Sequence, residues 1–389
     1  MIIYIKTQGS EIIKEGRHLL VKKGNDTYHT LFTYKLDQVL LFGNIKITHS
    51  ALCMLMRNNI DIVYLTRYGR YLGRIAPPES KNVFLHKLQY QMLDNTEFGL
   101  KIAKSIVAGK LTNMITLMMR IKRSRKCKDA GNKAQQIRNL LDGVQNADNV
   151  DSVRGFEGRG SAIYFSGFRY GFTENITFTK RVRRPPTDPV NSALSLLYTF
   201  LMNRVYSAVR IAGLDPYPGF LHTIDYGRYS LVLDLMEEFR STIVDTLVFS
   251  MFNMKILQKH DFRFEVPVIT GPPAQDDLDE CLPDINSDSL GMMTMTNNKT
   301  KKDFDIPEQR IEEVPAAGVA HAPGKYPVKL QPNAFRRVIA AFEKKLTAEF
   351  YYPPAEKKMT YGDVIIFQAA HYRKVIEGTA DVYQPMILK

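Results

Sequence analysis

The sequence predicts an α+β protein in which a small N-terminal β-sandwich domain, residues 1–80, precedes a larger all-α catalytic domain, residues 81–389. Three observations lead to this prediction. The 389 residues suffice for two domains of about 100–200 residues each. Near residue 80 the spacing of apolar residues changes from that of strands to that of helices. Pro77 and Pro78 mark the change, because tandem prolines cannot continue a hydrogen-bonded ladder.

The first 78 residues have the pattern of half-buried strands. Turn signals containing glycine separate the apolar runs, and residues 50–58 are apolar enough for one short helix. A small β-domain must bury such strand faces by packing them on each other. The alternating apolar positions are Ile3, Ile5, Leu19, Val21, Val39, Leu41, Ile45 and Ile47.

Beyond residue 80 the pattern is helical. The clearest helix start is Thr187-Asp188-Pro189, which supplies a capping side chain and a proline for the first turn. Further helices are predicted over residues 230–257, 333–348 and 360–376. The stripe after Pro189 has apolar residues three and four positions apart, at Val190, Leu194, Leu197, Leu201 and Val205.

Residues 271–320 interrupt the helical pattern. They hold eleven acidic and four basic side chains, a formal charge of −7 in a chain whose net charge is +13. Few of their apolar residues are periodic, which predicts a solvated, flexible acidic insert at about residues 268–325.

The chain as a whole is strongly basic, with a pI of about 9.4. This favours an acidic partner, either nucleic acid or an anionic membrane surface. The apolar N-terminal run is too short for a signal peptide, and the uncharged residues 189–203 fall short of the roughly 18–20 that a membrane helix needs. We therefore expect a cytoplasmic protein with no membrane partner. Its three widely spaced cysteines also suit a reducing compartment.

Basic residues gather in two runs, which fits contacts to phosphates that need no sequence readout. A solvated surface is the alternative for either run alone, and two runs in so basic a chain favour nucleic acid. The predicted DNA-binding residues are Arg120, Lys122, Arg123, Arg125 and Lys126 in the first run and Lys180, Arg181, Arg183 and Arg184 in the second.

Three carboxylates, Asp234, Glu237 and Glu238, are spaced to share one face of a helix. Like charges this close repel unless a cation lies between them. His222 lies just upstream in an apolar turn. A solvated helix face is the alternative for the carboxylates, and an ordinary hydrogen-bonded turn is the alternative for the histidine.

Glu157 adds another carboxylate, placed between glycines in residues 154–160. An ion pair with Arg154 or Arg159 is its alternative role. Glutamate, aspartate and histidine ligands suit Mg²⁺ or Mn²⁺, with positions left for water and phosphate oxygens. Structural zinc is disfavoured without paired cysteines. Spacing alone leaves open whether these elements meet in space.

Five segments, taken in order and spacing, resemble the Cas1 family, the integrases of CRISPR adaptation. The resemblance runs through most of the chain outside the acidic insert. The segments are LFGNIKIT (41–48), GFEG (155–158) with Tyr164, RRPPTDPVN (183–191), GFLH (219–222) and SLVLDLMEEFR (230–240).

The resemblance implies a Mg²⁺ or Mn²⁺ ion held by the catalytic residues Glu157, His222 and Glu237. It also implies double-stranded DNA as substrate and a homodimer, two of which flank a Cas2 dimer. Supporting roles, as substrate contact or scaffold, fall to Asp234, Glu238, Asn191, Tyr198 and Arg240.

The implied reaction is transesterification, in which the 3′-hydroxyl of a foreign DNA fragment attacks a phosphodiester at the edge of a CRISPR repeat. A metal-dependent nuclease acting on branched DNA would use the same site with water as the nucleophile. A non-catalytic DNA-binding scaffold is the alternative from another class, and the intact set of acids and histidine argues against it.

Overall fold

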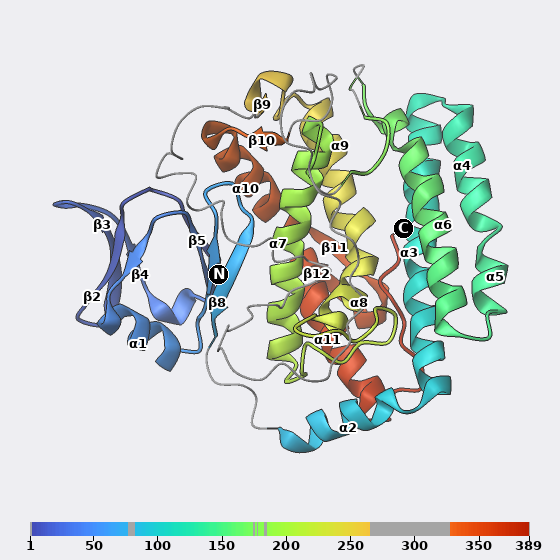
Figure 1. Cartoon of the computed structure of the whole chain (residues 1–389), viewed down its shortest axis with the longest axis horizontal. Coiled ribbons are helices and arrows are strands. Elements are labelled where there is room, and N and C mark those ends of the chain that lie inside the picture. The colour runs from blue at the N-terminus through green and yellow to red at the C-terminus, as the bar shows by residue number, and fades with distance from the viewer. Residues whose placement is uncertain are drawn as a thin grey trace, which may run out of the picture.

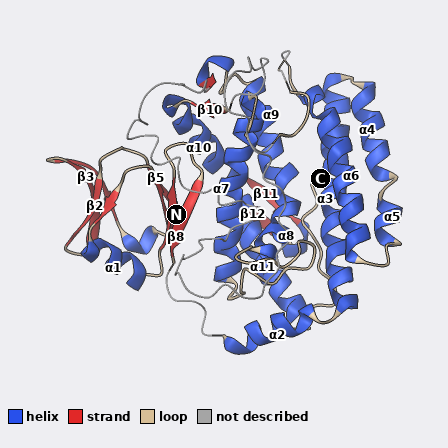
Figure 2. Ribbon diagram, viewed as in Figure 1, coloured by secondary structure: helices blue, strands red, loops and turns tan. Residues whose placement is uncertain are grey.

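The computed structural model describes residues 2–76, 82–173, 176, 178–182, 185–264 and 327–388. Strands form the N-terminal part and helices dominate the remainder (Figure 1 and Figure 2). The predicted domain boundary at residues 77–81 and the acidic insert lie outside the described residues. In the described part, no helix combines the length and hydrophobicity needed to cross a membrane.

The described N-terminal residues form two four-stranded sheets, one α-helix and a short 3-10 helix, Thr33–Lys35. Apolar residues of both sheets, such as Ile12, Val39 and Leu41, share one buried cluster. The predicted short helix is confirmed as α1, His49–Arg57, whose first turn is capped by the Thr48 side chain. One sheet has the order β1 Ile2–Ile5, β5 Gln38–Phe42, β7 Asp61–Leu65, β8 Tyr71–Ile75, and the other β4 Asp26–Leu31, β3 His18–Lys23, β2 Glu11–Glu15, β6 Lys46–Ile47.

The β1-β5-β7-β8 sheet is buried on both faces, so its strand β5 is apolar without alternation. Val39 and Leu41 face the other sheet, whereas Leu40 and Phe42 belong to the core that continues into the helices. The Phe42 ring lies 5.0 Å from that of Phe335, centroid to centroid. The strands and helices therefore share a packed interface in which aromatic rings meet edge to face.

The helical part is built around α3, which packs against α4, α6 and α8. In Figure 1, α3 to α6 form one side of the molecule and α7, α8 and α11 its centre. The predicted cap of α7 is confirmed, because Asp188 accepts a hydrogen bond from the backbone of Asn191. The helices are α2 Val83–Leu93, α3 Thr96–Arg125, α4 Lys128–Arg138, α5 Leu141–Gln145, α6 Val150–Phe168, α7 Pro189–Ile211, α8 Ser230–Phe239, α9 Thr246–Asn253, α10 Pro332–Leu346 and α11 Tyr361–Ile376.

The helical part is not all-α, which corrects the prediction. Strands β9 and β10 pair antiparallel, as do β11 and β12. The β11-β12 pair lies between α10 and α11 in the chain. Its turn contains Pro353 and Pro354, and prolines disfavour a continuous helix through this segment. The strands are β9 Phe262–Phe264, β10 Val328–Leu330, β11 Glu349–Tyr352 and β12 Lys357–Thr360.

The single helix predicted over residues 230–257 is also corrected. It is divided into α8 and α9 by a π-helical segment, Arg240–Asp245, and it ends at Asn253. A π-helical turn takes up more residues than an α-helical turn, so the residues after it are rotated relative to α8. Asp245, the last residue of the segment, contacts Tyr164 of α6 and Tyr198 of α7.

Candidate active site

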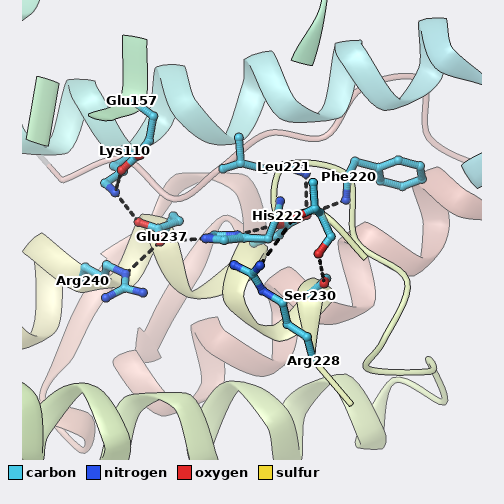
Figure 3. Close-up of polar contacts among 11 residues, drawn as sticks. Lys110, Glu157, Phe220, Leu221, His222, Arg228, Ser230, Glu237 and Arg240 are labelled. Carbon is cyan, nitrogen blue, oxygen red and sulfur yellow. Dashed lines mark hydrogen bonds and ion pairs between the residues drawn. The ribbon is translucent and has the colours of Figure 1, made fainter. Parts of the chain in front are cut away.

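Glu157 of α6, Glu237 of α8 and Lys110 of α3 meet in one ion-pair cluster (Figure 3). The ammonium of Lys110 lies 2.5 Å from Glu237 Oε2 and also pairs with Glu157 Oε1. Ser161 donates a hydrogen bond of 2.9 Å to that same glutamate oxygen. In place of the alternative partners Arg154 or Arg159, Glu157 has Lys110 and Ser161, and Arg154 pairs with its own helix neighbour, Asp151.

Glu237 is buried among positive groups. Arg240 Nε donates to Glu237 Oε1 at 2.9 Å, and His222 Nε2 lies 3.9 Å from that oxygen. Burial alone would raise the pKa of the carboxyl. The charges of Arg240 and Lys110 outweigh burial and hold the pKa at about 2. Glu237 is therefore ionised over the whole physiological range.

Asp234 fixes the turn that carries His222. One of its oxygens lies 2.7 Å from His222 Nδ1 and accepts a 2.9 Å hydrogen bond from the His222 backbone. The other oxygen accepts from the backbones of Phe220 and Leu221 at 2.7 and 2.9 Å. These contacts assign the ring proton to Nδ1, so the Nε2 lone pair is left facing Glu237.

Gly219 lets this turn approach the start of α8. A Cβ at this position would lie 2.6 Å from the carbonyl carbon of Ser230 and 2.8 Å from Asp234 Oδ2. Both distances are shorter than van der Waals contact. A glycine therefore has a steric reason to precede Phe220, Leu221 and His222.

The predicted alternative of a solvated helix face for Asp234 and Glu237 is wrong. These side chains are buried, with 1% and 3% of their residue surfaces exposed. Buried carboxylates need hydrogen bonds or opposite charges to offset lost hydration. Asp234 obtains hydrogen bonds from the 220–222 turn, and Glu237 obtains positive charge from Lys110 and Arg240.

Glu238 faces away from this cluster, although the spacing placed it on the same helix face. It accepts hydrogen bonds from Tyr383 at 2.7 Å, from Gln368 at 2.9 Å and from the Met386 backbone. Burial raises the pKa of Glu238 to about 7, because these neutral donors offset only part of the lost hydration. Its position is that of an anchor for the C-terminal tail, which we define as residues 379–388.

A cavity of about 370 Å³ opens beside the ion-pair cluster. Two predicted supporting residues, Tyr198 and Arg240, lie here, with the guanidinium 4.8 Å from the tyrosine ring centroid. The Tyr198 hydroxyl donates to Asp245 at 2.6 Å. The cavity is lined by Lys110, Met114, Ser161, Ala162, Phe165, Ser166, Thr179, Lys180, Arg181, Tyr198, Arg240 and Asp245.

The second basic run reaches this cavity through Lys180 and Arg181. Asn191 holds the run in place, since its side chain accepts from Arg181 at 2.9 Å and donates to the Lys180 carbonyl at 2.9 Å. Arg183 and Arg184 lie outside the described residues. Asn191 therefore contacts both the backbone and a side chain of the second basic run.

The first basic run lies at the end of α3 and in the turn after it, and its residues do not line the described cavity. Three of its members are exposed and two are half-buried. The exposed ones are Lys122, Arg123 and Lys126, and the half-buried ones are Arg120 and Arg125.

The sequence analysis missed Lys110 and Ser161. A signal for Lys110 is nevertheless present, because it lies four residues from Ile106 and from Met114, on the apolar stripe of α3. A lysine is rarely fully buried unless it is paired. A lysine at the centre of such a stripe therefore indicates a buried carboxylate partner.

The donor types suit a divalent ion, although the geometry is that of a site holding an ammonium. Within the described part of the chain, no three His, Cys, Asp or Glu side chains converge as a finished metal site. The place between Glu157 and Glu237 nevertheless already takes a cation, Lys110. Two carboxylates and an imidazole with a free Nε2 are ligands that Mg²⁺ and Mn²⁺ accept, so the residues fit the ion.

The fold and this site together define a class of mixed α/β protein. Its helical part brings two glutamates and a histidine close together beside a cavity lined by cations. Residues 3–267 match the family described as CRISPR associated protein Cas1. The chain therefore belongs to the Cas1 family.

One relative that matches over nearly its whole length carries the same family name, and solved structures share the fold. The chain is 28% identical, over 99% of its length and 97% of the relative's, to "CRISPR-associated endonuclease Cas1 1" of Chlorobaculum tepidum. The fold resembles a chain of a Cas6-RT-Cas1–Cas2 complex, with 23% identity and a TM-score of 0.75, covering 100% of this chain and 36% of that one. It also resembles a casposase bound to integration product, with 19% identity, a TM-score of 0.74 and 100% and 94% coverage.

Proposed function

We propose that this protein is a metal-dependent DNA integrase and endonuclease of CRISPR adaptation, which joins 3′-hydroxyl ends of foreign DNA fragments into a repeat array. One observation carries the proposal. In a Cas1 family chain, Glu157 and Glu237 share a cation, His222 Nε2 lies 3.9 Å from Glu237 Oε1, and a cavity lined by cations opens beside them. Carboxylates that hold a metal, next to cations that hold phosphates, are the elements of phosphoryl transfer to a hydroxyl.

The metal ligands of the proposed site are Glu157, His222 and Glu237. When bound there, Mg²⁺ or Mn²⁺ supplies a Lewis acid that polarises a phosphoryl oxygen and favours ionisation of the attacking hydroxyl. Asp234 fixes the tautomer of His222 so that Nε2 faces Glu237. Arg240 stays on Glu237 Oε1 and keeps this carboxylate oriented.

The proposed reaction exchanges one phosphodiester bond for another, so it needs no external energy source. The 3′-oxygen of the fragment forms a bond to phosphorus at the repeat edge, and the bond from that phosphorus to the leaving 3′-oxygen breaks. One proton leaves the attacking hydroxyl and one is taken up by the leaving oxygen. Lys180 and Arg181 at the cavity offset the negative charge that builds up on the phosphoryl oxygens.

The proposed substrate is double-stranded DNA, and the proposed assembly is two homodimers around a Cas2 dimer. The net charge of +13 supports a DNA substrate, and the fold is shared with a chain of a Cas1–Cas2 complex. The exposed basic residues of the first run would contact phosphates outside the active site.

Supplying a fragment with 3′-hydroxyl ends and a plasmid with a repeat array tests the proposal. We expect joined product with Mg²⁺ or Mn²⁺, and none after Glu157→Ala, His222→Ala or Glu237→Ala, with binding of the fragment retained. A variant that joins at a near-normal rate removes its residue from the proposed site. Strand transfer without a metal would favour a mechanism different from the one proposed.

Hydrolysis is the second candidate activity, since the relative from Chlorobaculum tepidum is named an endonuclease. The same experiment separates the two activities. Joined product identifies an integrase, and cleavage of branched DNA without joined product identifies a nuclease that uses water as its nucleophile.

A further inference from the structure

Lys110 occupies the place that the proposed chemistry gives to a divalent ion. Its ammonium pairs with Glu157 Oε1 and lies 2.5 Å from Glu237 Oε2, and these are the two proposed carboxylate ligands. An ammonium and a divalent ion repel each other strongly at such distances in a buried site. Binding of the metal therefore requires Lys110 to leave its position between the two carboxylates.

The adjoining cavity gives Lys110 a second position. Lys110 already lines this cavity, and the flexible four-carbon stem of a lysine lets its ammonium turn without moving α3. The cavity also presents Lys180, Arg181 and Arg240. Its lining carboxylate, Asp245, is already hydrogen-bonded by two tyrosines.

The balance of charge decides when this movement is favourable. With Lys110 in place, the positive charges of Lys110 and Arg240 balance the negative charges of the two carboxylates, Glu157 and Glu237. A divalent ion adds two positive charges, and a displaced ammonium then enters a cavity that is already cationic. A phosphate in that cavity offsets both changes, since it pairs with ammonium and guanidinium groups.

We propose that Lys110 is an exchangeable cation, which fills the metal position in the empty site and moves to a DNA phosphate when a divalent ion binds. The inference rests on the proposed function, because it takes the metal ligands and the DNA substrate from there. It makes metal and DNA binding cooperative: each ligand compensates the charge that opposes the other. Thermodynamic linkage makes the effect reciprocal.

A titration of Mn²⁺ into the full-length chain tests the exchange, with free Mn²⁺ followed by electron paramagnetic resonance. Each titration is done alone and with a duplex whose 3′ ends lack hydroxyls and cannot react. For the wild-type chain we expect DNA to tighten Mn²⁺ binding about tenfold. For Lys110→Met, which removes the competing charge, we expect Mn²⁺ to bind about tenfold tighter without DNA, and DNA to change this affinity less than about twofold.

Two variants serve as controls. Lys104→Met removes a lysine from the same helix, where it only donates to the Gln145 carbonyl, and should titrate like the wild type. Lys110→Arg keeps the charge and should preserve most of the effect of DNA on Mn²⁺ affinity. If Lys110→Met does not unfold cooperatively, Lys110→Gln removes the same charge with a polar side chain and is titrated instead.

Mn²⁺ binding that is unchanged or weaker in the charge-removing variant overturns the inference, because a lysine that only supports the site would give that result. Equal Mn²⁺ affinity with and without DNA in the wild-type chain overturns it as well. The proposed function fails on a different observation, the absence of joined or cleaved product from the wild-type chain.

Discussion

Glu237 and Glu238 are neighbours on α8, equally buried, and their surroundings are opposite. On one side of the helix, Lys110 and Arg240 keep Glu237 ionised, with a pKa of about 2. On the other side, neutral donors surround Glu238, and burial raises its pKa to about 7. The contrast teaches that burial alone does not set the charge of a carboxylate, since the partner groups decide which form persists.

The two sides also draw on different parts of the chain. The ionised side faces α3, α6 and the 220–222 turn, where the proposed chemistry takes place. The neutral side faces α11 and the C-terminal tail through Gln368 and Tyr383. Helix α8 is thus held, on the side opposite the proposed site, by neutral donors.

The largest expected effect separates the two glutamates by activity. Glu237→Gln should lower the rate of strand joining by at least about 100–1,000-fold, because a charged ligand of the proposed metal is lost. Glu238→Gln, the matched control one residue away, should join within about twofold of the wild type. Assays that quantify the joined product measure both rates. An equal loss in the two variants would contradict the different roles assigned to Glu237 and Glu238.

Substitution of Glu238, which should affect activity little, should lower the stability of the fold. Glu238→Ala removes the acceptor of three hydrogen bonds, at about 1 kcal/mol each, so we expect the free energy of unfolding to fall by about 3 kcal/mol. Urea denaturation measures this loss. Glu377→Ala, which breaks an exposed ion pair with Arg373, should cost less than about 1 kcal/mol. Equal losses would show that the tail is not held through Glu238.

Asp234 tests how far the ionised side depends on orientation. Asp234→Asn should weaken Mn²⁺ binding about 10–100-fold, because the amide no longer fixes the tautomer of His222 as a carboxylate does. A Mn²⁺ titration followed by electron paramagnetic resonance measures the change. Asp151→Asn, in an exposed pair with Arg154, should leave the affinity unchanged. Unaltered affinity in Asp234→Asn would mean that the 220–222 turn is rigid without its carboxylate.

The smallest expected effect is a dependence of stability on pH at Asp245. Burial raises the pKa of Asp245 to about 6, and the hydroxyls of Tyr164 and Tyr198 and the charges of Arg240 and Arg181 lower it only in part. The folded state thus holds the proton more tightly than the unfolded state, so stability falls as pH rises from about 4 through 6. Chemical denaturation at several pH values, compared with Asp245→Asn, should show a steeper fall in the wild type. Parallel curves would contradict the raised pKa.

Local patterns in the sequence predicted many of the elements correctly. The features that the prediction missed depend on contacts between residues far apart in the sequence. The cap at Asp188 and the short helix of residues 50–58 depend on neighbouring residues, so a pattern suffices for them. The partners of Glu238 lie 130 residues or more away along the chain, and no spacing rule relates them to α8. Lys110 lies 47 residues before Glu157; its place on an apolar stripe indicates a buried carboxylate partner, but no spacing rule identifies that partner.

The contacts of the C-terminal tail also determine when the site is completed during synthesis of the chain. Asn113 of α3 donates to the carbonyls of Glu238 and Met386 and accepts from the Leu388 backbone, so tail, α3 and α8 are joined at one side chain. On the ribosome, the residues around the two carboxylates emerge long before these partners, because chains grow from the N-terminus. The proposed site therefore obtains this rear support only after residues 148 positions beyond Glu238 have been made, and a nascent chain that lacks them carries the proposed ligands without the contacts that hold α8 in place.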